Sequence, residues 1–277
     1  MVDPIPALLT RTSLLEVMAR YGLEPHRTLG QNFVVDQNTI RKIVRLAGVE
    51  SGDAVVEIGP GLGSLTLGLL EAGAEVTAVE IDRRLIEPLT EITGGRARIL
   101  AADAMEVDWS TVVGDRDHTV VANLPYNVAT PVVLRLLDEA PQVTRMLVMV
   151  QREVGERLAA GPGSKAYGIP SVKVGYWATA RLVGTVGAEV FHPQPRVTSA
   201  LVEIVRREHP VHAVDPVVLF DLVRAGFGQR RKTLRRALGE RVTDAQLEAA
   251  EIDGRRRAEE LDVAEWCRLA EAVSPLR

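Results

Sequence analysis

Short apolar runs alternate with amphipathic segments through the first two hundred residues, and this alternation constrains the fold more than any other feature. The runs cover residues 53–59, 75–81, 97–103, 118–123 and 144–150. Helical patterns separate most of them. Apolar strands joined by helices are typical of a parallel sheet that is covered on both faces. The sequence therefore predicts a doubly wound α/β domain.

Two further runs, 180–187 and 199–207, lie close together, and no helical pattern separates them. We expect them to form an antiparallel pair that completes a mostly parallel, seven-stranded sheet. The pattern changes at residues 208–216, where two prolines interrupt the periodicity, and the remainder is typical of helices. The predicted organisation is an N-terminal extension (1–24), a sheet domain (25–208) and a small all-helical domain (213–277).

The composition is that of an ordinary globular protein, with 46% hydrophobic and 25% charged residues among 277. No apolar run reaches the roughly 18 residues that a membrane span needs, and the N-terminus lacks the basic start of a signal peptide. We therefore expect a cytoplasmic protein without a membrane partner. The single cysteine, Cys267, excludes an intrachain disulfide and a Cys-based zinc site. It is predicted to be a small apolar residue on a helix, and no metal site is expected.

Gly59, Gly61 and Gly63 occupy the turn between the first apolar run and the helix after it. Glycines at this position let the backbone approach a ligand beside a helix N-terminus. Their spacing differs from the G-x-G-x-x-G of dinucleotide-binding folds, and the Lys-Ser/Thr of a P-loop is missing. A turn that serves only helix–sheet packing would need the same residues, so the loop alone leaves both interpretations open.

Polar side chains follow the next three strands where each strand ends. Glu80 closes the second strand, where a carboxylate can accept both hydroxyls of a ribose. Asp103 closes the third and could accept from an adenine amino group, and Asn123 closes the fourth. The carboxyl ends of parallel strands line one crevice, which is the usual ligand site of an open α/β sheet.

Together these residues resemble the motifs of class I S-adenosylmethionine-dependent methyltransferases, whose fold is Rossmann-like. The resemblance implies S-adenosylmethionine as the methyl donor, bound by residues that include Gly59, Gly61, Glu80, Asp103 and Asn123. This ligand has an adenine, a ribose and a zwitterionic amino acid but no phosphate. Its structure therefore agrees with the absence of the phosphate-binding motifs of dinucleotide folds and P-loops.

The sequence Asn-Leu-Pro-Tyr at residues 123–126 resembles the (D/N/S)-P-P-Y signature of enzymes that methylate exocyclic amino groups of bases. Such an amine is a poor nucleophile because its lone pair is delocalised into the ring. Hydrogen bonds accepted by the Asn123 side-chain oxygen and the Pro125 main-chain carbonyl would draw the nitrogen toward sp³ geometry. Tyr126 would stack on the unstacked base. A proline turn with a half-buried tyrosine is the structural alternative.

Phe191, in the segment 191–204, offers a second aromatic ring that could hold the base against Tyr126. Pro193 and Pro195 follow it and stiffen its backbone. A core phenylalanine beside a proline-rich turn is the alternative interpretation. Before the first strand, Gln31 and Asn32 could fold over the amino-acid end of the donor as a lid.

Six segments together resemble the ribosomal RNA adenine dimethyltransferases, and most closely the branch that modifies small-subunit rRNA. They read LGQNFVVD, EIGPGLGSLT, NLPYN, MVQREVGERL, FHPQPRVTSALV and FGQRRKTLRRAL, and the resemblance runs from about residue 25 to about residue 240. The resemblance implies transfer of four methyl groups, which makes N6,N6-dimethyladenosine at two adjacent adenosines near the 3′ end of 16S rRNA. It adds Asn32 and Val34 to the donor contacts. Leucine is commoner at position 34, but a main-chain contact would survive that change.

The segment 224–236 carries six positive groups and no acid in a chain whose net charge is −4. We expect five residues to contact RNA: Arg230, Arg231, Lys232, Arg235 and Arg236. A solvated helix face is the usual role of such a run and is the alternative. A short basic patch on an acidic protein favours recognition of a folded particle, here the small ribosomal subunit. We expect the protein to be a monomer.

Three other functions compete with this one. Large-subunit rRNA methyltransferases that confer macrolide resistance carry the same motifs, but FGQRRKTL and the leucine of NLPY favour the small-subunit branch. A DNA adenine methyltransferase would normally carry Asp-Pro-Pro-Tyr and a target-recognition insertion, and this chain has neither. A non-catalytic assembly or transcription factor on the same scaffold would have eroded motifs, whereas these are intact.

Overall fold

The computed structural model describes residues 6–26 and 29–275. Residues 1–5 of the predicted extension and residues 27–28 therefore lie outside the described part. The described chain divides into two compact units, one formed by its residues up to 155 and 181–205, the other by 156–180 and 206–275.

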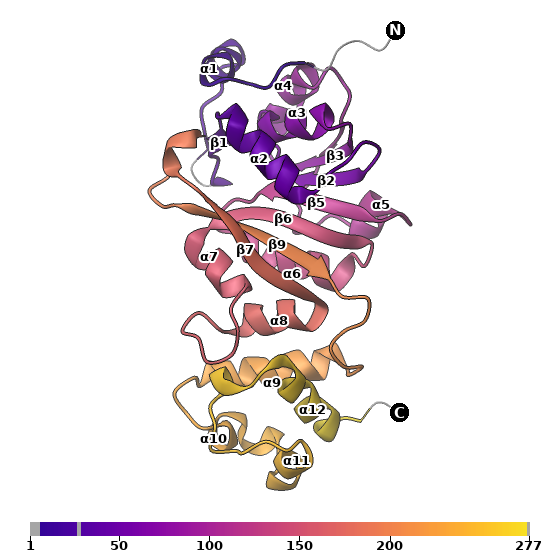
Figure 1. Ribbon diagram of the computed structural model, residues 1–277, viewed down its shortest axis with the longest axis vertical. Helices are drawn as coiled ribbons and strands as arrows, with labels where there is room; N and C mark the ends of the chain where they lie inside the picture. The colour runs from indigo at the N-terminus through magenta and orange to yellow at the C-terminus, as the bar shows by residue number, and fades with distance from the viewer. Residues whose placement is uncertain (1–5, 27–28, 276–277) are drawn as a thin grey trace. The chain divides into compact units, whose positions relative to one another are not determined.

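The first unit contains most of a seven-stranded sheet, with the order β4-β3-β2-β5-β6-β9-β7 (Figure 1). Its strands are β2 (Ala54–Ile58), β3 (Glu75–Glu80), β4 (Arg98–Ala101), β5 (His118–Asn123), β6 (Val143–Gln151), β7 (Ala178–Val186) and β9 (Ser199–Arg206). The strands from β2 to β6 pair in parallel, and β9 pairs antiparallel to β6. The predicted mostly parallel α/β sheet is confirmed.

Strand order reverses at β2, which has β3 on one side and β5 on the other. At such a reversal the connections leave in opposite directions, and a crevice opens beyond the carboxyl ends of the strands. All five residues of β2 are buried, as expected for a central strand covered on both faces. The fold therefore creates its ligand crevice where the glycine loop follows β2.

The helices of this unit are α1 (Arg11–Arg20), α2 (Gln37–Ala47), α3 (Ser64–Glu71), α4 (Ile86–Ile92), α5 (Trp109–Val113) and α6 (Ala129–Glu139). Asp36 caps α2 by accepting from the Thr39 amide at 2.6 Å, and Gly48 ends it in the left-handed conformation. The apolar face of α2 packs closely on α3, because a Cβ on Gly68 would lie 2.4 Å from Ile40. Both helices share a core with the sheet.

Helix α1 lies within the predicted extension, for which the sequence indicated no role. Its residues Leu14, Val17 and Met18 are buried in the same core as α2 and α3. Tyr21, just after the helix, donates its hydroxyl to Glu91 of α4, which also pairs with Arg20. The helix is therefore an integral layer of the first unit.

The second unit has an apolar core of its own. It is built by α8 (Ile169–Trp177), α9 (Pro216–Gly228), α10 (Leu234–Leu238), α11 (Asp244–Ala249) and α12 (Val263–Val273). Tyr167, Val172 and Tyr176 belong to this core, so residues 156–180 group with the C-terminal helices although the predicted sheet domain runs unbroken to 208. Cys267 is fully buried in α12, as predicted for a small apolar residue.

No helix among residues 6–26 and 29–275 is long and apolar enough to cross a bilayer. Within the same residues, no group of histidine, cysteine and acidic side chains could hold a metal ion.

Candidate active site

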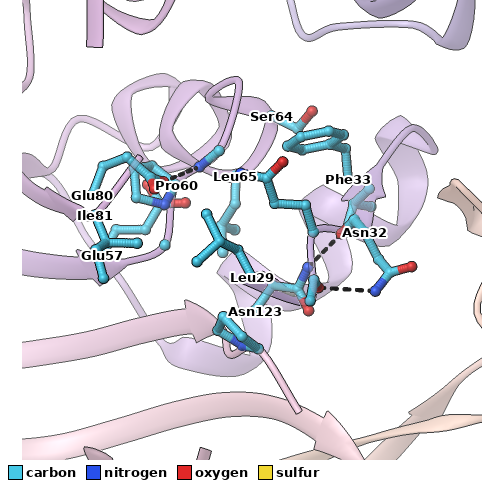
Figure 2. Close-up of a pocket in the computed structure, with 16 residues that line it drawn as sticks. Leu29, Asn32, Phe33, Glu57, Pro60, Ser64, Leu65, Glu80, Ile81 and Asn123 are labelled. Carbon is cyan, nitrogen blue, oxygen red and sulfur yellow. Dashed lines mark hydrogen bonds between the residues drawn. The ribbon is translucent and has the colours of Figure 1, made fainter. Parts of the chain in front are cut away.

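The crevice has two neighbouring halves, of about 630 and 680 Å³ including their open mouths. Leu29, Gly59, Ile81 and Pro125 line both halves, so the two form one continuous site. The polar side chains of the first half include those of Asn32, Glu57, Ser64, Glu80 and Asn123 (Figure 2). The second is lined by the segment after β4 and by the start of α6.

The three glycines of the loop all adopt left-handed backbone conformations, with φ of 69°, 59° and 83° at Gly59, Gly61 and Gly63. A Cβ at Gly61 would lie 2.7 Å from the Phe33 ring, and one at Gly63 would lie 2.7 Å from Leu89. Both the conformation and the space therefore require glycine. Gly59 and Gly61 line the first half of the crevice, where their backbone is open to a ligand.

Glu80 is buried at the end of β3, with only 4% of its surface exposed. Its Oε2 accepts from the Gly61 amide at 3.0 Å, and its Oε1 accepts from the Asp82 amide at 2.8 Å. Burial raises the pKa of Glu80, while the two amides oppose that rise by binding the charged form. Each oxygen keeps a further lone pair, so the carboxylate can accept two more hydrogen bonds in the crevice.

Glu57 and Ser64 line the same half, and neither was predicted from the sequence. Glu57 lies in β2, is 1% exposed, and accepts from the Thr66 hydroxyl at 2.6 Å. Burial raises the pKa of Glu57 to about 8. Ser64, the first residue of α3, is 5% exposed, and its hydroxyl has no partner among the described residues. The sequence feature that could have identified Glu57 is its position as a charged residue inside an otherwise apolar strand.

Replacing Glu57 by glutamine should flatten the pH dependence of stability. A carboxyl whose folded pKa is raised from 4.5 to about 8 contributes stability that is complete below pH 4.5 and is lost as the pH rises through 8. The slope is about 1.4 kcal/mol per pH unit. Glutamine can still accept from Thr66, so urea unfolding between pH 5 and 8 should show a shallower decline. Glu16→Gln on the exposed face of α1 is the control. Equal slopes in wild type and Glu57→Gln would contradict the assignment.

Asn123, at the end of β5, donates its side-chain amide to the Asn32 carbonyl at 2.9 Å (Figure 2). Because a carbonyl can only accept, this contact fixes the orientation of the amide and leaves the Asn123 oxygen as the available acceptor. The segment that carries Asn32 is held over the crevice by further contacts. Gln31 donates to Asp82 at 2.9 Å, and a Cβ on Gly30 would lie 3.2 Å from Pro125.

The second predicted acceptor, the Pro125 carbonyl, is already fully used. It accepts from the Val128 amide at 3.2 Å and from the Ala129 amide at 3.1 Å, in the turn that opens α6. A carbonyl has two lone pairs, so the expectation that it binds an amine does not fit this geometry. The neighbouring Leu124 carbonyl receives no hydrogen bond within the described chain, and it is the acceptor that remains.

The two aromatic residues of the predicted base site lie in different surroundings. Tyr126 is partly exposed, and its hydroxyl lies 3.2 Å from that of Ser199, a fully buried residue of β9. Phe191 is 1% exposed, in β8 (Phe191–His192), where it pairs with Val34 of β1 (Phe33–Val34). The described structure therefore does not bring Phe191 to the crevice surface, and its contact with a base stays a prediction.

Val34 and Asp103 both line the crevice, in its first and second halves respectively. The Asp103 carboxylate accepts from the Met105 amide at 2.7 Å, which orients it beside a largely apolar pocket. The structure thus brings together Asn32, Val34, Gly59, Gly61, Glu80, Asp103, Asn123 and Pro125 in one crevice.

The predicted RNA-binding residues belong to the second unit, and two of them are paired with acids. Arg230 pairs with Glu259 at 2.5 Å, and Arg235 pairs with Asp244 at 2.7 Å. The side chains of Arg231, Lys232 and Arg236 are exposed, and no partner is found for them within the described residues. Residues 229–231 form a turn after α9, and only Arg235 and Arg236 lie in α10, so the basic run does not form one continuous helix.

The sheet order, the glycine loop and the crevice define a Rossmann-like S-adenosylmethionine-dependent methyltransferase fold. Two solved structures share it. One is a dimethyladenosine transferase from Plasmodium falciparum, 24% identical, with a TM-score of 0.74 over 86% of this chain and 95% of that one. The other is the 23S rRNA methyltransferase ErmE, 25% identical, with a TM-score of 0.66 over 87% and 99%.

The chain belongs to the ribosomal RNA adenine dimethylase family, whose model matches residues 22–274. A relative from Leifsonia xyli, named ribosomal RNA small subunit methyltransferase A, is 49% identical over 95% of this chain and 98% of its own length. A relative of the same name from Streptomyces coelicolor is 47% identical over 98% and 99%. The resemblance inferred from the motifs is confirmed, and the chain is an enzyme of the adenine dimethyltransferase type.

Proposed function

We propose that this enzyme transfers methyl groups from S-adenosylmethionine to the N6 atoms of two adjacent adenosines near the 3′ end of 16S rRNA, during small-subunit biogenesis. The product is N6,N6-dimethyladenosine at both positions. The observation that carries the proposal is the placement of Asn123, an uncharged acceptor, in a crevice that also contains Glu80 and Asp103. The adjacent carbonyl of Leu124, which receives no hydrogen bond within the described chain, is the second uncharged acceptor. The names of the relatives support the small subunit as the substrate.

The residues of the crevice fit the methyl donor. Glu80 offers two carboxylate oxygens to the ribose, and the pocket beside Asp103 offers an apolar slot with a carboxylate for adenine. The orphaned, buried hydroxyl of Ser64 lies at the N-terminus of α3, where it can donate to the carboxylate of an amino acid. When bound, S-adenosylmethionine supplies a methyl group on a sulfonium ion, which the nearby carboxylates tolerate.

Asn123 and Leu124 prepare the amine by accepting its two N–H groups, through the side-chain oxygen and the main-chain carbonyl. Holding both protons in this way draws the nitrogen toward sp³ geometry and orients its lone pair. Positioning of this kind supplies most of the acceleration, and no titratable group is needed beforehand because the amine becomes acidic once it is methylated. Tyr126 offers its ring for stacking on the base, an interaction of about 1–3 kcal/mol.

The reaction class and the target can be tested together. Labelled S-adenosylmethionine would be incubated with undermethylated small subunits, with large subunits and with duplex DNA, followed by digestion to nucleosides. The proposal expects label in N6,N6-dimethyladenosine from small subunits only. Label from large subunits would favour the macrolide-resistance type, and label in DNA a DNA adenine methyltransferase. Binding to small subunits without any labelled product would indicate a non-catalytic assembly factor.

Removing the exposed cations of the basic run should weaken binding to the ribosomal subunit without affecting the donor. With Arg231, Lys232 and Arg236 all changed to alanine, the slope of log affinity against log salt should fall by about one for each phosphate that is no longer bound. Affinity for S-adenosylhomocysteine should stay constant.

The matched control for this variant changes three other arginines of the second unit to alanine. Arg224, Arg241 and Arg255 are also exposed, but they are paired with Asp221 or Asp253, and none of them is among the five predicted RNA contacts. The control variant should bind the ribosomal subunit more tightly than the first variant at every salt concentration. Equal weakening in both variants would mean that net charge, and not this patch, binds RNA.

A further inference from the structure

Arg135 of α6 makes three polar contacts with a side chain that is only 17% exposed. Its Nη1 donates to the Ala104 carbonyl at 3.1 Å, and its Nη2 donates to the Val107 carbonyl at 2.9 Å. Its Nε donates to Glu139, one turn further along the same helix, at 2.8 Å. None of the motifs singled out in the sequence includes Arg135, and it does not line the crevice.

The two carbonyls belong to the segment 102–107, which forms the wall of the adenine half of the crevice. Ala102, Asp103, Ala104 and Met105 line that half. The segment has no regular secondary structure, and it follows β4, an edge strand supported by β3 alone. Its first amide, that of Ala102, donates to the Glu80 carbonyl, and the Glu106 and Val107 amides donate internally to the Asp103 carbonyl. Beyond Ala102, the guanidinium of Arg135 joins the segment to the body of the unit.

The helix that provides this support also follows the acceptor motif. Helix α6 begins at Ala129, three residues after Tyr126, and its N-cap Val128 and its residue Val132 line the same half of the crevice. Arg135 therefore connects the segment that carries Asp103 to α6, whose first amides donate to the Pro125 carbonyl. A planar guanidinium can satisfy two carbonyls and a carboxylate at fixed spacing, which an ammonium group cannot.

We propose that Arg135 is a positioning residue for donor recognition: it holds the segment 102–107 so that Asp103 meets the amino group of the donor's adenine. The proposal rests on the proposed function, because it assumes that adenine binds in this half of the crevice. Arg135 acts through the segment and touches neither the donor nor the acceptor base.

The test compares two ligands in calorimetric titrations. S-adenosylhomocysteine carries the adenine amino group, and S-inosylhomocysteine carries an oxygen in its place. In Arg135→Ala, affinity for the first should fall about tenfold, which is the loss expected when the single charge-assisted hydrogen bond between Asp103 and the adenine amino group is no longer held in place. Affinity for the second should change little, so the preference between the two ligands should shrink. A merely structural role would weaken both ligands equally and leave the preference intact, which would overturn the proposal.

Two control variants separate the contacts. Glu139→Gln removes the ion pair but keeps both carbonyl contacts, and it should bind both ligands as the wild type does. Arg116→Ala removes an arginine that bridges Glu75 and the Gly52 carbonyl elsewhere in the unit, and it should also leave binding unchanged. If Arg135→Ala fails to fold, Arg135→Gln serves the same comparison, because it keeps most of the aliphatic stem and loses the fork.

A double variant shows whether Arg135 acts through Asp103. In an Asp103→Ala background, Arg135→Ala should cause no further loss of preference for the adenine ligand. If the two substitutions reduced the preference for the adenine ligand additively, Arg135 would act independently of Asp103, and the proposal would be refuted. Failure of the donor-binding part of the proposed function looks different: the wild-type protein would then bind neither ligand.

Discussion

Asn123→Ala should lower the rate of methyl transfer by about 10²- to 10³-fold while leaving the binding of S-adenosylhomocysteine measurable. The magnitude is that observed when one preorganised hydrogen-bonding group is removed from an active site. Alanine removes the oxygen that accepts from the amine and also the amide that donates to the Asn32 carbonyl. Single-turnover kinetics with undermethylated small subunits, at saturating donor, would measure the loss in the chemical step.

The matched control is Asn38→Ala, on the exposed side of α2, which should have wild-type turnover. Asn123→Asp provides a finer comparison. It keeps an acceptor for the amine but cannot donate to Asn32 when it is ionised, so its rate should lie between those of wild type and Asn123→Ala. Near wild-type turnover in Asn123→Ala would refute the role given to this side chain, whatever the family of the chain.

The parts of this site that the sequence predicted are those that depend on local pattern alone. Glu80, Asp103 and Asn123 each end an apolar run, and parallel strands bring such ends to one edge of a sheet. The loop glycines were predictable for a similar reason, since a strand-to-helix turn beside a ligand needs their conformations. The three polar residues, together with Gly59 and Gly61, line the crevice in the structure.

Other features of the site could not be predicted from the sequence. They depend on contacts between residues far apart in the chain, or on whether the lone pairs of a carbonyl already accept hydrogen bonds. Arg230 and Arg235 are neutralised by Glu259 and Asp244, whose proximity follows from the packing of the second unit. The Pro125 carbonyl is filled by the first turn of α6, which a residue pattern does not show. Phe191 is buried because β8 pairs with β1, two segments separated by more than half of the chain.

Glu80→Gln should weaken the binding of S-adenosylhomocysteine by about 100-fold or more. The glutamine amide nitrogen would face either the Gly61 or the Asp82 amide, so one of those buried donors would lose its acceptor. The hydrogen bond between a ribose hydroxyl and the carboxylate oxygen that this nitrogen replaces would be altered as well. Each such change at a charged, buried group costs about 1.5–3 kcal/mol, and two of them give the stated weakening.

The pH dependence of donor binding provides an independent check on Glu80. Burial raises the pKa of this carboxyl, and only its ionised form has every lone pair available to the two amides and the ribose. Wild-type affinity should therefore fall as the pH is lowered toward that raised pKa, and the fall should be missing in Glu80→Gln. Glu75→Gln, at the exposed start of the same strand, should follow the wild type at every pH. If Glu80→Gln bound the ligand as tightly as Glu75→Gln does, the crevice beside β3 would not be the ribose site, and the donor would have to bind elsewhere.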